Sequence, residues 1–574
     1  MRFLKNWRIN LILVIFFVLG AAIISRLFEL QVLERKMYQA QAVGQHTGFY
    51  NIKGDRGQIF CQANGIKGNT NSEDKKSLAI NRDNWTISAN TNIIEDKISF
   101  AKILSKNINQ TEDQILALLE GDSSYVTIEK NLSTDHLEKI KSLNLKGLSW
   151  QNNPLRFYPQ ADFASQVLGF LGGEGIGQYG VEGFYDDILQ GKTGIVKEIK
   201  GLNSILQKNN QISLDGSDIY LTIDYNIQLQ AESLLKKAKN NLDITAGQII
   251  VLDPNLGKVL ALANYPTYDP NQYSKVKDLE IFQNGAIQKL FEPGSIMKPF
   301  TMAAAINEGK ITPETTYIDT GSVKVGPETI NNFAKEKYGE ISMTEALKNS
   351  VNTGAVFAQQ KMEHKVFWDY IEKFGFTQKT GIDLQGEVFS RNESLKKGWD
   401  VEYATASFGQ GIEITPIQIA RAYCALANGG KMVKPYIVEK IINDSDSIYT
   451  KPDISDPIIS QQTVSQINKM LINVVDEGFG GVAKIPGYYL AGKTGTAQIP
   501  LTNGRGYEPE SQTIQSFVGY GPALNPQFLI LVKLDRPKVP KSSLSAVPIF
   551  KELAQYIINY FKIPPDYDLK IENK

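Results

Sequence analysis

The chain has 574 residues, of which 42% are hydrophobic, so it is too long for one ordinary domain and can bury cores in two or more. Its 61 basic and 61 acidic side chains cancel to a formal net charge of zero. Without a strongly basic block, we expect no nucleic-acid partner. The few histidines and cysteines are scattered, which argues against a Ser-His-Asp triad, a zinc site and a disulfide framework, and we expect no metal and no cofactor. These residues are His46, His136, His364, Cys61 and Cys424, the last of them in an apolar helix that we expect to be buried.

The N-terminal segment is predicted to be one transmembrane helix over residues 9–30, after a cytoplasmic stub of residues 1–8. An uninterrupted apolar run covers residues 11–24 and is prolonged by its neighbours toward the lower limit of about 17 residues for a span. Basic residues precede the run, which places the N-terminus in the cytoplasm and the rest of the chain outside it. A cleaved signal peptide is the alternative, because small residues occur at positions 20–22.

Residues 31–235 are predicted to form a mixed α+β domain without a catalytic constellation. They combine short strands, Asn-rich turns and amphipathic helices such as residues 111–120. We interpret this domain as a pedestal that holds the active domain above the membrane. A partner-binding module is a compatible alternative.

Residues 236–562 are predicted to form an α/β domain in which a sheet packs on a helical lobe, followed by a C-terminal tail of residues 563–574. Strand patterns lie at both ends of this domain and helical patterns lie between them. We expect an opening hairpin, a strand with two close glycines, a second hairpin and a closing helix. The corresponding residues are 246–253 with 258–263, 488–499, 514–521 with 528–534, and 548–560.

A serine and a lysine three residues apart, Ser295 and Lys298, are the first candidate catalytic pair. Residues three apart lie on one face of a helix, so the lysine amine would lie beside the serine hydroxyl. A buried lysine near a second cation has a lowered pKa and can serve as the base that a serine nucleophile needs. Other S-x-x-K patterns lie in polar or charged surroundings, whereas Ser295 follows a Pro-Gly turn and opens an apolar helix. Those patterns begin at Ser72, Ser99, Ser233, Ser274 and Ser394.

The motif K-T-G occurs three times, at Lys192, Lys379 and Lys493. The first two copies lie in predicted turn and loop contexts, so we interpret them as decoys. The copy at Lys493 lies in an extended segment where a substrate backbone can approach a strand edge. Lys493 would supply the second cation of the site. The predicted substrate-binding residues are Thr494, Gly495 and Thr496, and the two threonine hydroxyls would face a bound carboxylate.

Ser350 and Asn352 form a third pattern, S-x-N. This pattern is common, and a helix cap or a turn is its alternative interpretation. It follows the helical pattern of residues 343–348, so we expect it in a loop between helices that reaches into a cleft.

In their order along the chain, these patterns resemble the signature of penicillin-binding proteins and class A β-lactamases. The residues around them, 292–300, 349–354 and 493–498, are similar to those of class B penicillin-binding proteins of the FtsI type, which are cell-division D,D-transpeptidases. The similarity covers nearly the whole chain. Val351 stands where the class A pattern has aspartate, and no E-x-x-L-N stretch is found, which argues against rapid hydrolysis. Further segments that resemble landmarks of the family are residues 55–59, 156–159, 177–183, 253–257 and 408–416.

The resemblance implies a serine-transpeptidase (β-lactamase-like) domain on a non-catalytic, dimerisation-type pedestal. Ser295 would attack the penultimate carbonyl of a D-Ala-D-Ala stem peptide, with Lys298 as the base, and β-lactams would acylate the same serine. The backbone N–H groups of Ser295 and Thr496 would form the oxyanion hole. The remaining roles implied are proton relay for Ser350 and Lys493, binding of the substrate amide for Asn352, and binding of the terminal carboxylate for Thr494 and Thr496.

The resemblance also implies a single-pass protein of the cytoplasmic membrane that acts in septal cell-wall synthesis. Its partners would be peptidoglycan stem peptides, a membrane glycosyltransferase and other division proteins. An elongation-specific class B transpeptidase is one alternative. A D,D-carboxypeptidase or β-lactamase-type hydrolase would use the same residues with water as the acceptor, and the acceptor diamine and oligomeric state stay open.

Overall fold

The computed structural model describes residues 7–28, 47–63, 75–200, 205–210, 215–443, 446–501, 506–509 and 511–568. The chain divides into two compact units, of which the first comprises residues 1–57 with 190–217 and the second residues 58–189 with 218–574. The described elements of the first unit are helix α1 (Trp7–Phe28) and a three-stranded antiparallel sheet in the order β1-β10-β11. Its strands are β1 (Thr47–Lys53), β10 (Thr193–Lys200) and β11 (Ile205–Asn210).

Helix α1 lies where the sequence predicts a membrane anchor. Within the ranges that the structure describes, no helix has both the length and the apolar character needed to cross a membrane. The predicted transmembrane helix over residues 9–30 is therefore not confirmed. Residues 1–6 of the predicted stub, residues 29 and 30, and residues 569–574 of the predicted tail lie outside the described residues.

The second unit contains a six-stranded sheet in the order β21-β20-β12-β2-β3-β7. Strand β12 pairs with β2 in parallel and with β20 in antiparallel orientation. Residues of the predicted pedestal and residues of the predicted catalytic domain therefore share one sheet. The strands are β2 (Ile59–Gln62), β3 (Lys75–Arg82), β7 (Leu155–Phe157), β12 (Asp218–Asp224), β20 (Val438–Ile442) and β21 (Ser447–Tyr449).

Helix α9 (Tyr225–Leu242) crosses the expected domain boundary between residues 235 and 236. Asp224 caps its start, and Leu234 and Leu235 are buried on its inner face. An amphipathic helix buries one continuous apolar face, so the structure has no break at the expected boundary.

A small lobe within the second unit has a core of its own. Its three-stranded sheet has the order β5-β4-β6. The amphipathic helix expected at residues 111–120 is confirmed, since α4 starts at a capping box on Thr111 and buries Ile115 and Leu119. The elements of this lobe are β4 (Trp85–Asn90), β5 (Tyr125–Leu132), β6 (Leu148–Asn152), α3 (Lys97–Leu104), α4 (Glu112–Glu120) and α5 (Thr134–Ser142).

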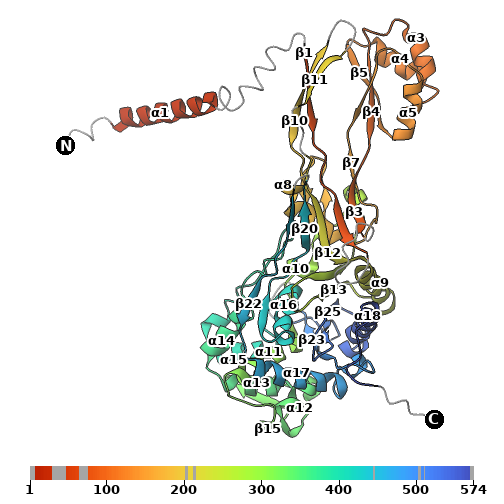
Figure 1. The fold of residues 1–574 in the computed structure, drawn as a ribbon. Helices are drawn as coiled ribbons and strands as arrows, with labels where there is room; N and C mark the ends of the chain where they lie inside the picture. The colour runs from red at the N-terminus through yellow and green to blue at the C-terminus, as the bar shows by residue number, and fades with distance from the viewer. Residues whose placement is uncertain are drawn as a thin grey trace, which may run out of the picture. The chain divides into compact units, whose positions relative to one another are not determined.

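The expected α/β sheet is a five-stranded antiparallel sheet in the order β14-β13-β25-β24-β23. Both faces are covered, because Ile250 and Leu252 of β13 belong to the core around α11 and α16, whereas Ile249 and Val251 pack with α9 and α18 (Figure 1). Both predicted hairpins and the closing helix are confirmed. Their bounds are β13 (Ala246–Leu252), β14 (Val259–Tyr265), β23 (Ala491–Gln498), β24 (Thr513–Gly521), β25 (Phe528–Asp535), α16 (Pro416–Ala427) and α18 (Ala546–Tyr560).

Helix α11 (Lys298–Asn307) is the centre of the helical lobe, and every residue from Lys298 to Ile306 is buried. The other elements of this part of the unit are helices of different lengths and small two-stranded sheets. The helices are η3 (Pro270–Lys275), η4 (Leu279–Phe282), α10 (Gly285–Gln288), η5 (Gly294–Met297), η6 (Phe333–Lys335), α12 (Met343–Lys348), α13 (Asn352–Gln360), α14 (His364–Lys373), η7 (Leu395–Lys397), α15 (Asp400–Ala406) and α17 (Gln461–Asp476). The two-stranded sheets are β15 (Thr316–Asp319) with β18 (Gly339–Ser342), β16 (Ser322–Val325) with β17 (Glu328–Asn331), and β19 (Lys431–Val433) with β22 (Ile454–Pro457). The remaining short elements of the unit are α6 (Ser165–Leu168), β8 (Phe170–Leu171), β9 (Gly177–Gln178), α7 (Gly180–Phe184), α8 (Asp186–Leu189), η8 (Gly481–Ala483) and η9 (Ser542–Leu544).

Candidate active site

Ser295 lies on η5, a single 3-10 turn that runs directly into α11. The tight turn has a local cause, because Pro299 has no N–H to bond the carbonyl of Ser295, and the N–H of Lys298 bonds it instead. The preceding Gly294 has a φ of +59°, and a Cβ there would come within 2.9 Å of the carbonyl oxygen of Thr496. Only glycine combines this backbone with so close an approach, so the Pro-Gly turn lets the serine turn lie against β23.

Lys298 points its amine at the Ser295 hydroxyl, as the spacing predicts. Its Nζ donates to Ser295 Oγ at 3.0 Å and to Ser350 Oγ at 3.2 Å, and also to the carbonyl of Ser350. The side chain is completely buried. Burial, followed by the charge of nearby Lys493, holds the pKa of Lys298 well below its ordinary value. A lysine in this environment favours its neutral form, which is the form that can accept a proton.

Lys493 reaches the same point from strand β23. Its Nζ donates to Ser350 Oγ at 2.9 Å, and to the carbonyl and hydroxyl oxygens of Thr494 at 3.2 and 3.3 Å. It is also completely buried, and burial lowers its pKa to about 7. Gly495 lets the strand approach the serine turn, because a Cβ there would come within 2.9 Å of Ile296 Cγ2.

Ser350 joins the two lysines, since its hydroxyl accepts a hydrogen bond from each. It has a φ of +55°, a left-handed conformation that is rare for a residue with a Cβ. The cause is the end of α12, where Val351 N–H bonds Ala346 O at 2.8 Å and Ser350 N–H bonds Leu347 O at 3.2 Å. This is the Schellman arrangement, whose left-handed position usually carries glycine. A serine in this conformation lowers the stability of the fold by about 1 kcal/mol relative to glycine. The conformation places the Ser350 hydroxyl between the two lysines.

Asn352 is the first residue of α13, as expected for a pattern between helices. Its Nδ2 donates to the backbone carbonyl of Asn331 at 2.9 Å. The side chain therefore lines the groove next to Ser350, and it donates this hydrogen bond to the groove wall.

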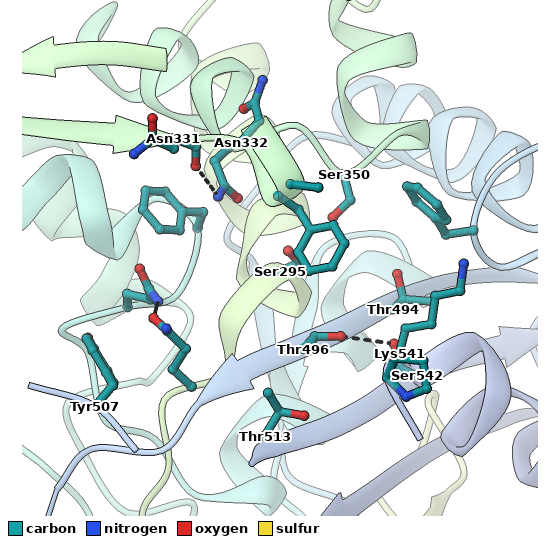
Figure 2. Close-up of a pocket in the computed structure, with 18 of the residues that line it drawn as sticks. Ser295, Asn331, Asn332, Ser350, Thr494, Thr496, Tyr507, Thr513, Lys541 and Ser542 are labelled. Atoms are coloured by element: carbon teal, nitrogen blue, oxygen red, sulfur yellow. Dashed lines mark hydrogen bonds between the residues drawn. The ribbon is translucent and has the colours of Figure 1, made fainter. Parts of the chain in front are cut away.

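A groove of about 1640 Å³ opens over these residues and is lined by Ser295, Ser350, Asn352, Thr494 and Thr496. Figure 2 shows the two serines and the two threonines turned toward a common space. The three sequence patterns thus meet in one cleft. Gln410, in the segment 408–416 that resembles a family landmark, also lines the groove. Sequence reasoning missed other lining residues, namely Phe333, Gln498, Tyr507, Thr513, Lys541 and Ser542.

Some of these residues touch a predicted residue or each other. Ser542 Oγ lies 3.4 Å from Thr496 Oγ1, and Gln410 Nε2 donates to Gln498 Oε1 at 3.1 Å. Strand alternation could have identified Gln498, because it follows Thr494 and Thr496 at a spacing of two and faces the same side. Ser542 comes from a distant segment without a motif.

The two other K-T-G copies have different surroundings. Lys379 is exposed in a loop, and the hydroxyl of Thr380 donates to Glu387. Lys192 is exposed and belongs to the first compact unit. Ser72, one of the other S-x-x-K serines, lies outside the described residues. Neither described K-T-G decoy therefore enters the cleft.

Neither Cys61 nor Cys424 lines the groove. No group of three or more His, Cys, Asp or Glu side chains in the described ranges is arranged to hold a metal ion. Cys424 is buried in α16, as expected, and Cys61 is buried in β2; both are free thiols. The site places a serine hydroxyl beside a lysine amine that favours its neutral form, and these two groups can carry out acyl transfer.

Comparisons with known proteins cover most of the chain. A sequence profile described as "Penicillin binding protein transpeptidase domain" matches residues 247–555, and one described as "Penicillin-binding Protein dimerisation domain" matches residues 62–221. Stage V sporulation protein D of Bacillus subtilis (strain 168) is 32% identical over 84% of this chain and 74% of its own length. The peptidoglycan D,D-transpeptidase FtsI homolog of Mesostigma viride is 29% identical over 97% of this chain and 96% of its own. Penicillin binding protein 2X of Streptococcus thermophilus has a solved structure with a TM-score of 0.76 at 24% identity, covering 90% of this chain and 81% of that one, a likeness that shows the fold alone.

Proposed function

The chain belongs to the penicillin-binding proteins, and on that premise we propose that it cross-links peptidoglycan stem peptides through an acyl-enzyme on Ser295. It is a serine D,D-transpeptidase with an α/β transpeptidase domain after an N-terminal dimerisation domain. The observation that supports the assignment of Ser295 is the chain of contacts in which Lys298 reaches its hydroxyl and Ser350 connects Lys298 to Lys493.

In the first half of the reaction, Ser295 Oγ bonds to the carbonyl carbon of the penultimate D-alanine of the donor stem. Its proton passes to the neutral amine of Lys298. The C–N bond to the terminal D-alanine then breaks, and the leaving amine takes a proton through Ser350, which connects the two lysines. The products of this half are free D-alanine and an ester on Ser295.

In the second half, the amine of a neighbouring stem attacks the ester carbonyl. The amine loses a proton to the lysine pair, and Ser295 Oγ leaves and regains its proton. A new amide between two stems has then formed, and no water is consumed. A strained β-lactam amide would acylate Ser295 in the first half and then stay bound.

The remaining predicted residues bind and orient the donor. Backbone N–H groups of Ser295 and Thr496 would hold the developing oxyanion, and loss of one such donor typically costs about a hundredfold or more in rate. Thr494 and Thr496 present hydroxyls for the terminal carboxylate, with Gly495 allowing the close approach of the strand. Asn352 would hold the substrate amide.

The test is the site of penicillin attachment. We expect mass spectrometry of the penicillin-treated protein to place the adduct on the peptide that contains Ser295, and Ser295→Ala to abolish labelling by a fluorescent penicillin. Labelling of the Ser295→Ala protein at an unchanged rate would assign the nucleophile to another residue.

We further propose that the chain is of the FtsI type and acts at the septum with a membrane glycosyltransferase and other division proteins. The support is the similarity to the Mesostigma viride FtsI homolog over nearly the full length of both chains. A fluorescent fusion should concentrate at division sites and should co-purify with a glycosyltransferase. A fusion spread along the lateral wall would instead favour an elongation role.

The membrane attachment and the domain division are also proposals. The apolar run of residues 11–24 with its basic flank supports an anchor at 9–30, with the pedestal at 31–235 and the catalytic domain at 236–562 outside the cytoplasm. Carbonate-washed membranes should retain the full chain and lose a chain that starts near residue 40. Release of the full chain by carbonate would contradict the anchor.

A further inference from the structure

Helix α13, which starts with Asn352, has no cap of its own. Val351 occupies the cap position, and its side chain makes no capping hydrogen bond. The first N–H groups of a helix have no partner within the helix and need one from elsewhere. For Thr353, the partner is the side-chain oxygen of Asn332, which accepts from its N–H at 3.1 Å and lies 21 residues earlier in the chain. The cap of α13 is therefore supplied by a different part of the groove wall.

Asp319, at the end of β15, fixes the orientation of this capping side chain. Asn332 Nδ2 donates to the two carboxylate oxygens of Asp319 at 2.9 and 3.0 Å, and to the carbonyl of Glu336 at 3.1 Å. With its amide nitrogen engaged in this way, the Asn332 amide must turn its oxygen toward Thr353. The acceptor of the cap is thus set by a second residue.

The Asp319 carboxylate is itself surrounded by donors. It is only 2% exposed, and it accepts from the Thr353 hydroxyl at 2.7 Å, from Gly321 N–H at 3.0 Å and from Tyr338 N–H at 2.9 Å. Burial acts to raise the pKa of Asp319, but these hydrogen bonds outweigh it and lower the pKa, so the group stays ionised. An ionised, fully satisfied carboxylate is a rigid anchor.

The residue beside the cap touches Asn352 directly, because the Asn331 carbonyl accepts from Asn352 Nδ2. Residues 331 and 332 therefore hold both the side chain of Asn352 and the first turn of its helix. Figure 2 shows Asn331 and Asn332 on the wall of the groove, on the side of Ser350. Ser350, two residues before Asn352, is in a strained conformation that persists only where the surroundings determine it.

We propose that Asp319 and Asn332 are positioning residues for the transpeptidation reaction, acting as an external cap that holds the start of α13, and with it Asn352 and Ser350, in place. The inference rests on the proposed function only in using acylation as its readout. A residue with a side-chain acceptor at position 351 could cap the helix locally. Val351 has no side-chain acceptor, so Asn332 caps the helix instead.

The experiment exchanges the two side chains in the full-length protein. Asp319→Asn puts one amide nitrogen against another, and Asn332→Asp puts two carboxylates face to face, so each should slow penicillin acylation about tenfold to a hundredfold, as expected for small misplacements of catalytic groups. In the double exchange, the new amide at 319 can donate to the new carboxylate at 332, which still accepts from Thr353 N–H. The exchange leaves Tyr338 N–H and the Glu336 carbonyl without their present partners, so we expect the double variant to recover part of the lost rate and to acylate faster than the slower single variant.

The recovery separates positioning from mere stability. Lys337→Gln, an exposed change in the same segment, serves as the control and should acylate at the wild-type rate. The inference is overturned if both single variants acylate at the wild-type rate, or if the double variant is no faster than the slower single variant. Loss of rate that follows the fraction unfolded in thermal denaturation would also overturn it. Failure of the proposed function has a different signature, because the wild-type protein itself would then carry no adduct on Ser295.

Discussion

The two walls of the groove hold their functional groups by different means. Strand β23 is joined to β24 along its whole length, in register from Ala491 opposite Tyr520 to Gln498 opposite Thr513, so a backbone ladder positions its lysine and threonines. The opposite wall, which carries Ser350 and Asn352, is irregular and is held by side-chain hydrogen bonds that converge on one buried carboxylate. Single side-chain changes far from the chemistry should therefore disturb the second wall much more than the first. The exception on the first wall is Gly495, where the strand leaves no room for a side chain.

The largest effect is expected on the irregular wall, at Ser350. Both Ser350→Gly and Ser350→Ala remove the hydroxyl that connects the two lysines, and we expect penicillin acylation to fall on the order of a hundredfold to a thousandfold. The two variants should differ in stability, because glycine adopts the left-handed conformation freely and alanine does not. Denaturant unfolding should find Ser350→Gly more stable than Ser350→Ala by about 1 kcal/mol. Equal stabilities would mean that the backbone at this position is not strained.

Gly495 tests the regular wall. A Cβ at this position would press first on Ser516 Oγ of the paired strand β24 and then on Ile296 beside Ser295, so the close approach of β23 to the serine turn must change. We expect Gly495→Ala to slow acylation about tenfold to a hundredfold while the sheet remains folded. Gly481→Ala is the matched control, because a Cβ there meets no atom closer than 3.8 Å. Wild-type rates for both variants would show that the close approach of strand and serine turn is not needed.

The same contrast explains what the sequence could and could not predict. Strands β13, β14, β24 and β25 are buried on both faces, and their apolar runs identify them as strands and hairpins. The catalytic groups lie within short motifs whose spacing has a mechanical reason, so Ser295 and Lys298 could be paired from sequence, and the helical context singled them out.

The supports of the irregular wall could not be predicted in this way. Asp319 and Asn332 act over separations of 34 and 21 residues on Thr353, and no periodicity or motif relates such positions. The six-stranded sheet was missed for a similar reason, since its parallel pair joins Ile59 to Ile219. The continuous helix α9 across residues 235 and 236 could not be anticipated either, because the sequence alone does not show which helix packs on which sheet.

The pH dependence of acylation tests whether the two walls work as one unit, because Lys298 and Lys493 meet at Ser350. An ordinary lysine has a pKa of 10.5, whereas Lys493 has a pKa of about 7 and that of Lys298 is also well lowered. The rate of acylation should therefore fall by up to about tenfold per pH unit below about pH 7, because protonation removes the base. The apparent pKa values of this profile belong to the lysine pair and not to either lysine alone. The folded state prefers the Lys493 amine neutral, so the destabilisation caused by its burial is fully present below about pH 7 and disappears as pH rises toward 10.5. A rate that keeps climbing up to pH 10.5 would show that the lysines have ordinary pKa values.

The smallest effect is expected from a change in the K-T-G copy at Lys379, outside the cleft. This copy has the motif without the groove wall, so it shows whether the motif alone matters. Lys379 has the same two following residues as Lys493, but its amine is exposed in a loop, and Thr380 is held by Glu387. Lys379→Ala should therefore acylate within about twofold of the wild-type rate, since exposed substitutions away from special features rarely matter. Lys493→Ala in the same assay should lose most of its activity, because it leaves Ser350 with one lysine instead of two. If Lys379→Ala were the slower of the two variants, the motif at residues 379–381 would be the functional one, and the groove wall formed by β23 would be a scaffold.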